Sequence, residues 1–334
     1  MTVQIGVIGT GNIGRYHVDT LAQRVSGAAV VAVFDVDTER AAQVAGPVGA
    51  TARASAEAVV ADDAVQAVVV ASPGELHAEQ VLACLDAGKP VLCEKPLAPT
   101  TVECLKVVDA EVAGGRQLVQ LGFMRRYDPA YLDLKAAFDA GELGEALLVH
   151  CVHRNAGVHD YFTSDMSLTD SVVHEVDTCR WLLGDEIVAV TVRAGKPSPH
   201  AAIRDPQMVL FETASGVLVD VESFVNARYG YDVRCELVGS DGVASMGTPA
   251  PGTVTQSGST GARVPADWRE RFDAAFRAEL QDWVHSVRDG EVRGASAWDG
   301  YAATAVAEAG LRARAEGTRV AVELVDRPTL YQRS

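Results

Sequence analysis

The amino-acid sequence predicts an α/β protein, in which an N-terminal doubly wound parallel sheet is followed by an α+β domain with a large, mostly antiparallel sheet. Short apolar runs alternate with helical stretches through the first third of the chain, and a glycine-rich turn follows the first run. After residue 123, longer and more polar strand-like runs replace this alternation. Because 334 residues exceed the usual size of one domain, we expect two domains, residues 1–122 and residues 123–334.

The N-terminal domain is expected to contain five short strands with helices between them. The strands are expected at residues 4–8, 30–34, 65–71, 91–93 and 118–122. The third strand is almost entirely Val and Ala, which is typical of a parallel strand covered on both faces. The helices are expected at residues 16–25, 39–45, 76–87 and 100–113. Gly88 and Pro90 indicate the end of the third helix.

In the C-terminal domain, turn signals separate five longer strand candidates. These strands are expected at residues 146–154, 186–194, 207–213, 217–224 and 231–239. Few helical stretches intervene, and this predicts an antiparallel sheet. One helix is expected after Pro129, and two more, at residues 267–288 and 297–315, complete the chain. Residues 248–261 are rich in Gly, Ser, Thr and Pro, so we expect a surface loop there.

The composition is that of a globular protein with an acidic surface. Apolar residues make up 48% of the chain and charged residues 22%, and the formal net charge is −16. This charge repels phosphate backbones and anionic lipid heads, which argues against nucleic-acid or membrane-surface binding. Neither a secretory signal nor a run long enough to span a bilayer is apparent. The 6 scattered cysteines include no Cys-x-x-Cys pair, so we expect buried free thiols in a reducing cytoplasm.

The turn after the first strand reads GTGNIG, residues 9–14, and matches the pattern G-x-G-x-x-G. Gly9 permits the tight turn, Gly11 lets the backbone approach a pyrophosphate, and Gly14 allows close packing of the helix on the strand. The N–H groups at the start of the helix, around Asn12 and Ile13, and the helix dipole would then hold the phosphates. The turn therefore predicts a dinucleotide-binding Rossmann domain.

Asp35 stands at the end of the second strand, at about the distance past the glycines that dinucleotide-binding domains use. There it would accept hydrogen bonds from the adenosine ribose hydroxyls and repel a 2′-phosphate, which predicts NAD rather than NADP. Val36 and Asp37 follow directly, so Arg40 is the nearest arginine. The alternative interpretation is an ordinary strand-to-helix turn in which Asp37 or Thr38 caps the next helix.

Two further strand ends carry candidate site residues, because ligands bind at the carboxyl ends of strands in such sheets. Ser72 and Pro73 follow the third strand and are expected near the nicotinamide. Glu94, Lys95 and Pro96 follow the fourth, and the proline restricts the lysine backbone and permits a cis bond. Lys95 could hydrogen-bond a substrate hydroxyl and stabilise alkoxide character as hydride leaves. The alternative is a solvated lysine in a loop.

The segment TDSVVHEVD, residues 169–177, begins a helical pattern. Asp170 and His174 are four residues apart and share a helix face, with Asp177 one turn further along. Removal of hydride from an alcohol carbon needs a base for the hydroxyl proton, and a histidine beside a carboxylate suits that role. In the alternative interpretation Asp170 caps the helix and His174 is a core histidine. No metal is expected, since H-E-x-x-H would need a second histidine where Thr178 stands.

Taken together, these segments resemble the glucose–fructose oxidoreductase/inositol dehydrogenase (Gfo/Idh/MocA) superfamily over essentially the whole chain. The matching segments are GTGNIG, the acid at Asp35, EKP, GFMRRYD, HRN, TDSVVHEVD and NARYGYDVRCELVG. EKP and the helix with Asp170 and His174 mark the superfamily, whereas GFMRRYD and HRN look like bacterial inositol 2-dehydrogenases. The resemblance implies NAD-dependent oxidation of a cyclic polyol, with myo-inositol, converted to 2-keto-myo-inositol (scyllo-inosose), as the leading substrate.

The resemblance also implies roles for individual residues. Lys95, Asp170 and His174 would form the catalytic set, with His174 as general base, Asp170 as its partner and Lys95 orienting the hydroxyl. Cofactor contacts are expected from the glycine turn, Asp35, Ser72, Pro73, Glu94 and Lys95. Ring contacts are expected from Arg125, His153, Asp177 and one of Tyr229 or Tyr231. Members of the superfamily commonly form homo-tetramers through the open sheet of the C-terminal domain.

Two alternative functions stay open at this point. The same scaffold could oxidise another inositol isomer, an aminocyclitol or an aldose, because only pocket residues would differ. Residues 157–165 and 248–261 are expected to border that pocket. A non-catalytic NAD-binding sensor would be expected to lack Lys95 or His174, and both are present.

Overall fold

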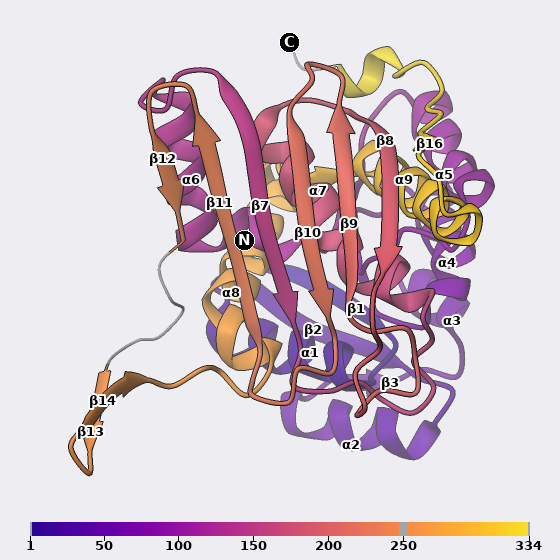
Figure 1. Cartoon of the computed structure of the whole chain (residues 1–334). Helices are drawn as coiled ribbons and strands as arrows, with labels where there is room; N and C mark the ends of the chain where they lie inside the picture. The colour runs from indigo at the N-terminus through magenta and orange to yellow at the C-terminus, as the bar shows by residue number, and fades with distance from the viewer. Residues whose placement is uncertain (1, 247–252, 333–334) are drawn as a thin grey trace. The chain divides into compact units, whose positions relative to one another are not determined.

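The computed structural model describes residues 2–246 and 253–332 (Figure 1). The chain folds into two compact units. Unit 1 consists of Met1–Phe123, Phe276–Thr304 and Leu324–Ser334, and unit 2 of Met124–Ala275 and Ala305–Glu323. A single division after residue 122 therefore differs from these units, because the chain returns twice to unit 1. The first return occurs within a long helix, α8 (Trp268–Asp289), and the chain leaves unit 1 again within α9 (Ala297–Glu316). The second return begins at Leu324, after α9 has ended.

Unit 1 holds a seven-stranded sheet in the order β15-β6-β5-β4-β1-β2-β3. Strands β1 to β6 run parallel, and β15 (Ala295–Ser296) is antiparallel to β6 at one edge. The parallel strands are β1 (Val3–Ile8), β2 (Ala28–Phe34), β3 (Thr51–Ala52), β4 (Ala67–Val70), β5 (Val91–Cys93) and β6 (Val119–Leu121). The strand order changes direction between β1 and β4, which confirms the predicted doubly wound sheet and marks the switch point where such sheets bind ligands.

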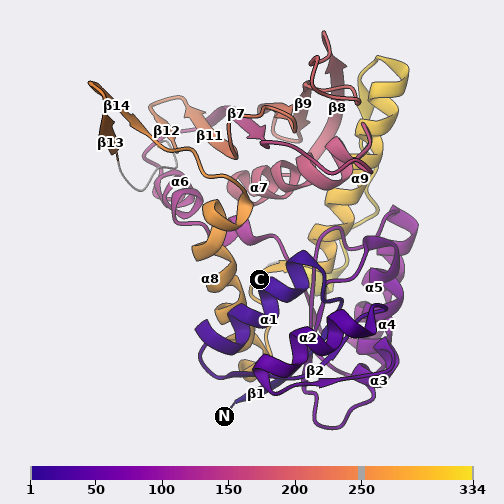
Figure 2. The ribbon, with the colours of Figure 1, turned by 90° about the horizontal axis from the view of Figure 1, so that it is seen from below.

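Helices cover both faces of this sheet because the strands are apolar on both sides. They are α1 (Asn12–Arg24), α2 (Thr38–Val48), α3 (Ala56–Val60), α4 (His77–Asp86) and α5 (Thr101–Gly114). The later half of α8 joins them: Leu280 and Trp283 pack in one core cluster with Val18 and Leu21 of α1. Figure 2 shows α8 beside α1, and α4 beside α5. Unit 1 thus needs the returning segment to complete its core.

Local sequence determines where several of these helices begin and end. The side chains of Asp37, Ser55 and Thr100 cap α2, α3 and α5 by accepting a backbone N–H of the first turn. Gly88 follows α4 with a φ of 65°, the left-handed conformation that favours glycine, as predicted. These helix ends depend on neighbours in the chain, which explains why the sequence pattern could locate them.

Unit 2 holds a second seven-stranded sheet, in the order β12-β11-β7-β10-β9-β8-β16. Neighbouring strands are antiparallel except β7 and β10, which pair in parallel. The strands are β7 (Ala146–Arg154), β8 (Ile187–Ala194), β9 (Gln207–Thr213), β10 (Leu218–Phe224), β11 (Asp232–Gly239), β12 (Val243–Ser245) and β16 (Val320–Ala321). The predicted α+β domain with a mostly antiparallel sheet is confirmed. The short strands β12 and β16 were not anticipated.

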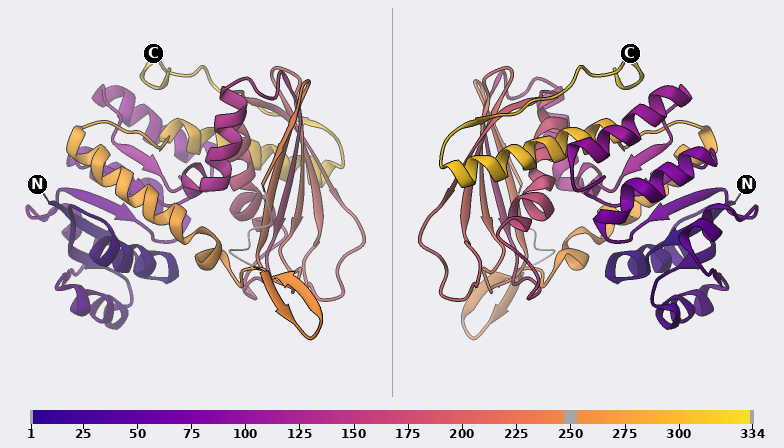
Figure 3. Two further views of the ribbon diagram at one scale, coloured as in Figure 1. Left: turned by 90° about the vertical axis from the view of Figure 1, so that its left-hand side faces the viewer. Right: turned by 90° about the vertical axis from the view of Figure 1, so that its right-hand side faces the viewer.

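The two faces of the second sheet differ. One face is covered by α6 (Pro129–Asp139) and α7 (Val173–Leu183), as Figure 3 shows. On the other face, four apolar side chains remain 36% to 46% exposed, and three of them are flanked along their strands by buried residues. We call this set the open face; it consists of Leu148, Met208, Leu210 and Leu218. Such an apolar surface is typical of a protein–protein contact.

The predicted surface loop at 248–261 is wrong over its second part. Residues 248–252 lie outside the described residues, but β13 (Thr253–Gln256) and β14 (Ser259–Ala262) pair as an antiparallel hairpin. Ser257 and Gly258 both have positive φ, 52° and 77°, which is the backbone that a two-residue hairpin turn requires. Composition alone indicated a loop because Thr, Ser, Gly and Gln make up most of the two strands.

The six cysteines are free thiols, and all are buried. Within unit 2, Cys151 Sγ lies 3.9 Å from Cys179 Sγ and from Cys235 Sγ. They act as small core side chains, in line with the prediction of buried free thiols. Among the described residues, no helix combines the length and the apolar character needed to cross a membrane.

Candidate active site

The glycine turn joins β1 to α1, and its three glycines are needed for different reasons. Gly9 has a φ of 89°, and a Cβ there would lie 2.6 Å from the backbone of Ala71. A Cβ on Gly14 would lie 1.9 Å from the carbonyl oxygen of Gly9. No atom lies within 4 Å of a Cβ built on Gly11, which is the N-cap of α1 and has no side chain to cap it. The open approach to Gly11 and the uncapped N–H groups of Asn12 and Ile13 fit a pyrophosphate.

Asp35 directly follows β2, and its carboxylate points back toward the glycine turn. Its Oδ2 accepts from the backbone N–H and the hydroxyl of Thr10, at 2.7 and 3.0 Å, and its Oδ1 accepts from the N–H of Asp37 at 2.9 Å. Burial raises the pKa of Asp35, but hydrogen bonds from Arg40, Asp37 and Thr10 outweigh it and lower the pKa to about 2. Asp37 caps α2, as the alternative interpretation proposed. Because Asp37 caps the helix, Asp35 is not needed for that role. Its low pKa keeps it an ionised carboxylate beside the glycine turn.

His77 connects the two loops that follow β4 and β5. Its Nδ1 lies 2.7 Å from the carbonyl oxygen of Pro96, and its Nε2 lies 2.8 Å from that of Ser72. Carbonyl oxygens only accept, so the ring donates through a nitrogen that carries a proton. The Lys95–Pro96 peptide bond is cis. The buried ring of His77 thereby ties the Ser72–Pro73 loop to the Lys95 loop, a role that the sequence pattern did not reveal.

The carboxylate of Glu94 is held inside unit 1. Its Oε1 lies 2.7 Å from His17 Nε2, and its Oε2 accepts the backbone N–H of Lys95 at 3.2 Å. A Cβ on Gly122 would lie 3.1 Å from the carboxyl carbon, so glycine leaves just enough space beside it. Glu94 therefore fixes the backbone at Lys95 and links it to α1.

The segment with the predicted acid–base residues is helical, with a wider first part. Ser167–Val172 is a π-helix that continues directly into α7. Asp170 lies in the π-helix and is half-buried, and His174 lies in the first turn of α7 and is 8% exposed. The sequence pattern predicted one regular helix here. A π-helix has i→i+5 hydrogen bonds and therefore more residues per turn than an α-helix, and such segments occur frequently at functional sites.

Two further predicted residues lie in unit 2: His153 lies beside His174, and Tyr231 lies beside His153. The ring centroids of His153 and His174 are 6.4 Å apart, and those of His153 and Tyr231 are 6.0 Å apart. Tyr231 is buried, whereas the exposed Tyr229 bonds Arg154 and Asp232 through its hydroxyl. Of the two candidate tyrosines, Tyr231 is therefore the one that lies beside His153.

The two adjacent arginines of GFMRRYD are both engaged in buried ion pairs. Arg125 bonds Glu175, and its Nη2 lies 3.2 Å from His153 Nδ1, which is itself 3.0 Å from Glu175 Oε2. Arg126 holds both oxygens of Asp177, at 3.0 and 2.5 Å. Burial raises the pKa of Glu175, but Arg125 and His153 lower it to about 2. The pair of Arg125 and Glu175 holds His153 in position.

Glu175 and Arg126 are the residues of these two ion pairs that sequence reasoning did not place in the site. From the sequence alone, Glu175 is considered only as part of the metal motif H-E-x-x-H, together with His174. A charge count could have found it, because HEVD carries two carboxylates and GFMRRYD carries two adjacent arginines. Within the ranges that the structure describes, no group of three or more His, Cys, Asp and Glu side chains is arranged to hold a metal ion.

Comparisons with known proteins agree with this arrangement. Residues 3–123 match the oxidoreductase family with an NAD-binding Rossmann fold, and residues 131–245 match the GFO/IDH/MocA C-terminal domain. The chain is 55% identical to inositol 2-dehydrogenase 1 of Saccharopolyspora erythraea, over 99% of both chains. It is 47% identical to inositol 2-dehydrogenase of Pseudomonas fluorescens, over 99% of this chain and 100% of that one.

Solved structures show the same likeness. A myo-inositol dehydrogenase from Lactobacillus casei, in complex with NAD(H) and myo-inositol, superposes with a TM-score of 0.96 at 34% identity, covering 99% of this chain and 100% of that chain. A scyllo-inositol dehydrogenase from the same organism shares the fold, with a TM-score of 0.89 at 24% identity, covering 96% of this chain and 99% of that chain. The chain therefore belongs to the Gfo/Idh/MocA family of NAD-binding oxidoreductases.

Proposed function

We propose that the chain is an NAD-dependent dehydrogenase that oxidises myo-inositol to 2-keto-myo-inositol. The observation that carries this proposal is the 55% identity, over nearly the whole chain, to an inositol 2-dehydrogenase. The open approach to Gly11 and the ionised Asp35 support NAD as the cofactor. NAD, when bound, supplies the hydride acceptor, and this chain's own residues bind the polyol and manage its hydroxyl proton.

The proposed catalytic residues are Lys95, Asp170 and His174. His174 takes the proton of the reacting hydroxyl as general base, and Asp170 raises its basicity. Lys95 donates a hydrogen bond to the same hydroxyl oxygen and stabilises the negative charge that develops there. The hydrogen bond from the Lys95 N–H to Glu94, together with the His77 bridge, supports this role because both restrain the lysine loop.

The proposed cofactor contacts begin at the glycine turn, with Gly9, Gly11, Asn12, Ile13 and Gly14, and continue through Asp35, Ser72, Pro73, Glu94 and Lys95. Within this set, Gly11, Asn12 and Ile13 face the pyrophosphate, and Asp35 accepts from the adenosine ribose. The bonds of Glu94 to His17 and to the Lys95 backbone favour a supporting role for its carboxylate.

For the polyol we propose direct contacts from Lys95, His153, His174 and Tyr231. Arg125 and Asp177 were also expected to contact the ring. Their partners Glu175 and Arg126 favour positioning roles instead, with Arg125 orienting His153. Polar groups around an uncharged polyol select one isomer, because a wrong epimer leaves buried donors and acceptors unpaired.

The substrate assignment is tested by following NADH formation with purified protein. The panel consists of myo-, scyllo- and chiro-inositol with glucose, xylose and galactose, each with NAD and with NADP. Fast turnover of myo-inositol with NAD supports the proposal. Turnover of only another isomer, an aminocyclitol or an aldose keeps the mechanism and changes the substrate, and NAD binding without any turnover would favour a sensor.

We also propose that the protein is a homo-tetramer that works in the cytoplasm. The apolar open face supports assembly, since Leu148, Met208, Leu210 and Leu218 would otherwise face water. The net charge of −16 gives no support to a nucleic-acid or anionic-membrane partner. Light scattering coupled to size-exclusion chromatography measures the assembly directly.

A further inference from the structure

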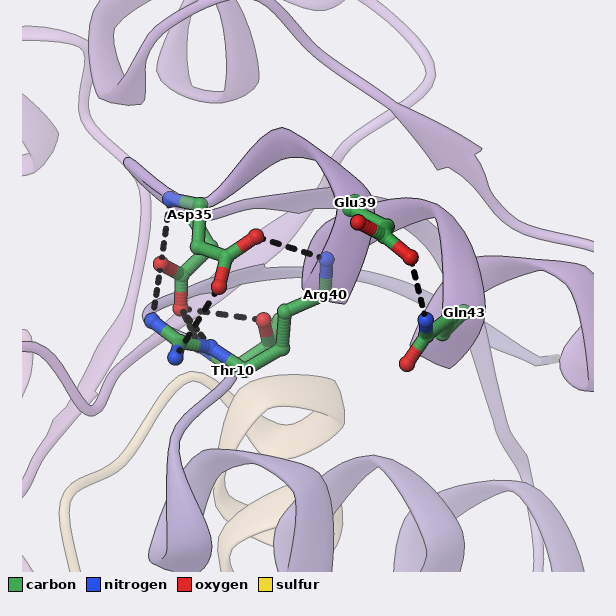
Figure 4. Close-up of polar contacts among 6 residues, drawn as sticks. Thr10, Asp35, Glu39, Arg40 and Gln43 are labelled. Carbon is green, nitrogen blue, oxygen red and sulfur yellow. Dashed lines mark hydrogen bonds and ion pairs between the residues drawn. The ribbon is translucent and has the colours of Figure 1, made fainter.

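The carboxylate of Asp35 already accepts five hydrogen bonds from the protein. Besides Thr10 and Asp37, Arg40 donates twice, from Nη2 to Oδ1 at 2.6 Å and from Nε to Oδ2 at 3.2 Å (Figure 4). A carboxylate offers about four lone-pair sites. The adenosine ribose hydroxyls can therefore reach Asp35 only by displacing a protein donor.

Among these donors, Arg40 is the one that can leave. The donors of Thr10 belong to the tight glycine turn, and the N–H of Asp37 belongs to the start of α2, so both are positioned by backbone structure. The side chain of Arg40 is long, flexible and 44% exposed. The Asp35 side chain is 6% exposed, but the exposed guanidinium of Arg40 can turn into solvent when another donor reaches the carboxylate.

A displaced Arg40 stays close to the same site. Its Nη1 already lies 3.4 Å from Asp37 Oδ2, so a second carboxylate can retain the guanidinium. Glu39, the next residue along α2, accepts a hydrogen bond from Gln43 at 3.2 Å, as Figure 4 also shows. The guanidinium would then lie next to the ribose 2′ position, where it is a suitable partner for a phosphate.

We propose that Arg40 is a specificity-determining residue for the cofactor: it competes with the adenosine ribose for Asp35, and it gives NADP a residual binding partner. Both effects reduce the discrimination between NAD and NADP. The inference rests on the proposed NAD-dependent function and adds to it a second residue besides Asp35. It predicts that the strongest NAD preference occurs when Arg40 is absent and Asp35 is kept.

The test is a double-mutant cycle on cofactor binding. Dissociation constants for NAD and NADP are measured by calorimetry with cofactor-free protein for the parent chain, Arg40→Gln, Asp35→Ser and the double variant. Arg40→Gln is expected to bind NAD roughly two- to five-fold more tightly, because one competitor for Asp35 is lost, and to bind NADP more weakly. Asp35→Ser is expected to gain NADP affinity, and Arg40→Gln in that background should remove the gain.

Arg293→Gln is the matched control. Arg293 also lies near two carboxylates, Asp282 and Asp289, at a similar side-chain exposure of 38%. It is not part of the Asp35 cluster, so both dissociation constants should stay at the parent values. Arg40→Lys should keep part of the NADP affinity, because lysine retains the charge but not the paired donors.

Three results separate the inference from the proposed function. Unchanged NAD and NADP affinities in Arg40→Gln would overturn the role of Arg40 while NAD binding by the parent chain stands. Retained NADP affinity in the double variant would overturn the phosphate contact. Failure of the parent chain to bind either cofactor would reject the proposed function and this inference together. Unfolding curves for each variant check that the fold is retained.

Discussion

Arg125 and Glu175 form a buried ion pair in unit 2, so the stability of the fold depends on the charge of each of these two side chains. Both side chains are 1% exposed, and His153 lies within hydrogen-bond distance of each. The three groups stabilise one another only as a set, since a buried charge without its partner is costly. The network therefore holds His153 rigidly beside His174.

Glu175→Gln should destabilise the protein at neutral pH. The change leaves the Arg125 guanidinium buried without a counter-charge, for which we expect a loss of about 3–5 kcal/mol in the free energy of unfolding. Urea unfolding followed by circular dichroism measures it. Asp139→Asn, which removes an exposed carboxylate paired with Lys135, is the control and should stay within about 0.5 kcal/mol of the parent.

The same residue predicts a pH dependence. The pKa of Glu175 is lowered from its ordinary value of 4.5 to about 2, so the folded state favours its ionised form. Its stabilisation is complete above pH 4.5 and is lost as the pH falls toward 2. As the pH is lowered from 4.5 toward 2, the free energy of unfolding should therefore decrease less steeply in Glu175→Gln than in the parent protein. An equal slope in variant and parent would contradict the assignment.

His174→Ala tests the proposed general base. We expect kcat for myo-inositol oxidation to fall by about 10² to 10⁴, with the NAD dissociation constant nearly unchanged, because the base acts on the hydroxyl proton and not on the cofactor. Steady-state NADH formation and calorimetry give the two quantities. His200→Ala, at an exposed position, is the control. A nearly normal kcat in His174→Ala would remove His174 from the mechanism.

At the level of elements, two glycines in the connection from β1 to α1 are needed for different reasons, one for the fold and one for the proposed cofactor contact. Gly14 is packed against the Gly9 carbonyl, whereas Gly11 has an ordinary φ of −65° and open space where a Cβ would stand. The fold therefore requires glycine at one position, and the proposed pyrophosphate contact requires it at the other.

Gly11→Ala and Gly14→Ala should consequently fail in different ways. For Gly11→Ala we expect a free energy of unfolding within about 0.5 kcal/mol of the parent, since nothing obstructs the methyl group. We expect its NAD binding to be weaker by about tenfold or more. Gly14→Ala should be clearly destabilised, because its Cβ would overlap a backbone oxygen. Thermal unfolding and calorimetry distinguish the two. Full NAD affinity in Gly11→Ala would contradict the cofactor site.

Two loops at the same edge of the first sheet also act as one element. His77 joins them through the carbonyls of Ser72 and Pro96, and Glu94 joins the second loop to α1 through His17. Buried polar groups that are bonded in this way keep loop backbones in one arrangement. The backbone of Lys95, the proposed catalytic lysine, is therefore held in one conformation.

At the level of the whole molecule, the open face supports the proposed tetramer. Leu210 lies on β9 and is 37% exposed, with Met208 two residues away on the same face. Leu210→Lys should place a charge in the interface and dissociate the assembly, as light scattering would show. Val102→Lys, on the 67% exposed side chain of a helix in unit 1, is the control. An unchanged mass for Leu210→Lys would exclude this face as the interface.

Much of the molecule could be read from residues that are close together in the chain. The strand runs, the helix ends at Asp37 and Gly88, the glycine turn and the TDSVVHEVD helix depend on local periodicity and backbone conformation, which neighbouring residues control. The family followed from the same segments. The hairpin at 253–262 was missed because its polar strands lack the apolar alternation on which such predictions depend.

The pairing of charges, by contrast, became known only from the folded chain. Arg125 meets Glu175 across 50 positions, His17 meets Glu94 across 77, and His77 meets the Pro96 carbonyl across 19. No local pattern encodes such contacts, because the strand order decides which distant segments become neighbours. The sequence could therefore nominate the candidate site residues, whereas tertiary structure determined which of them are paired inside the protein.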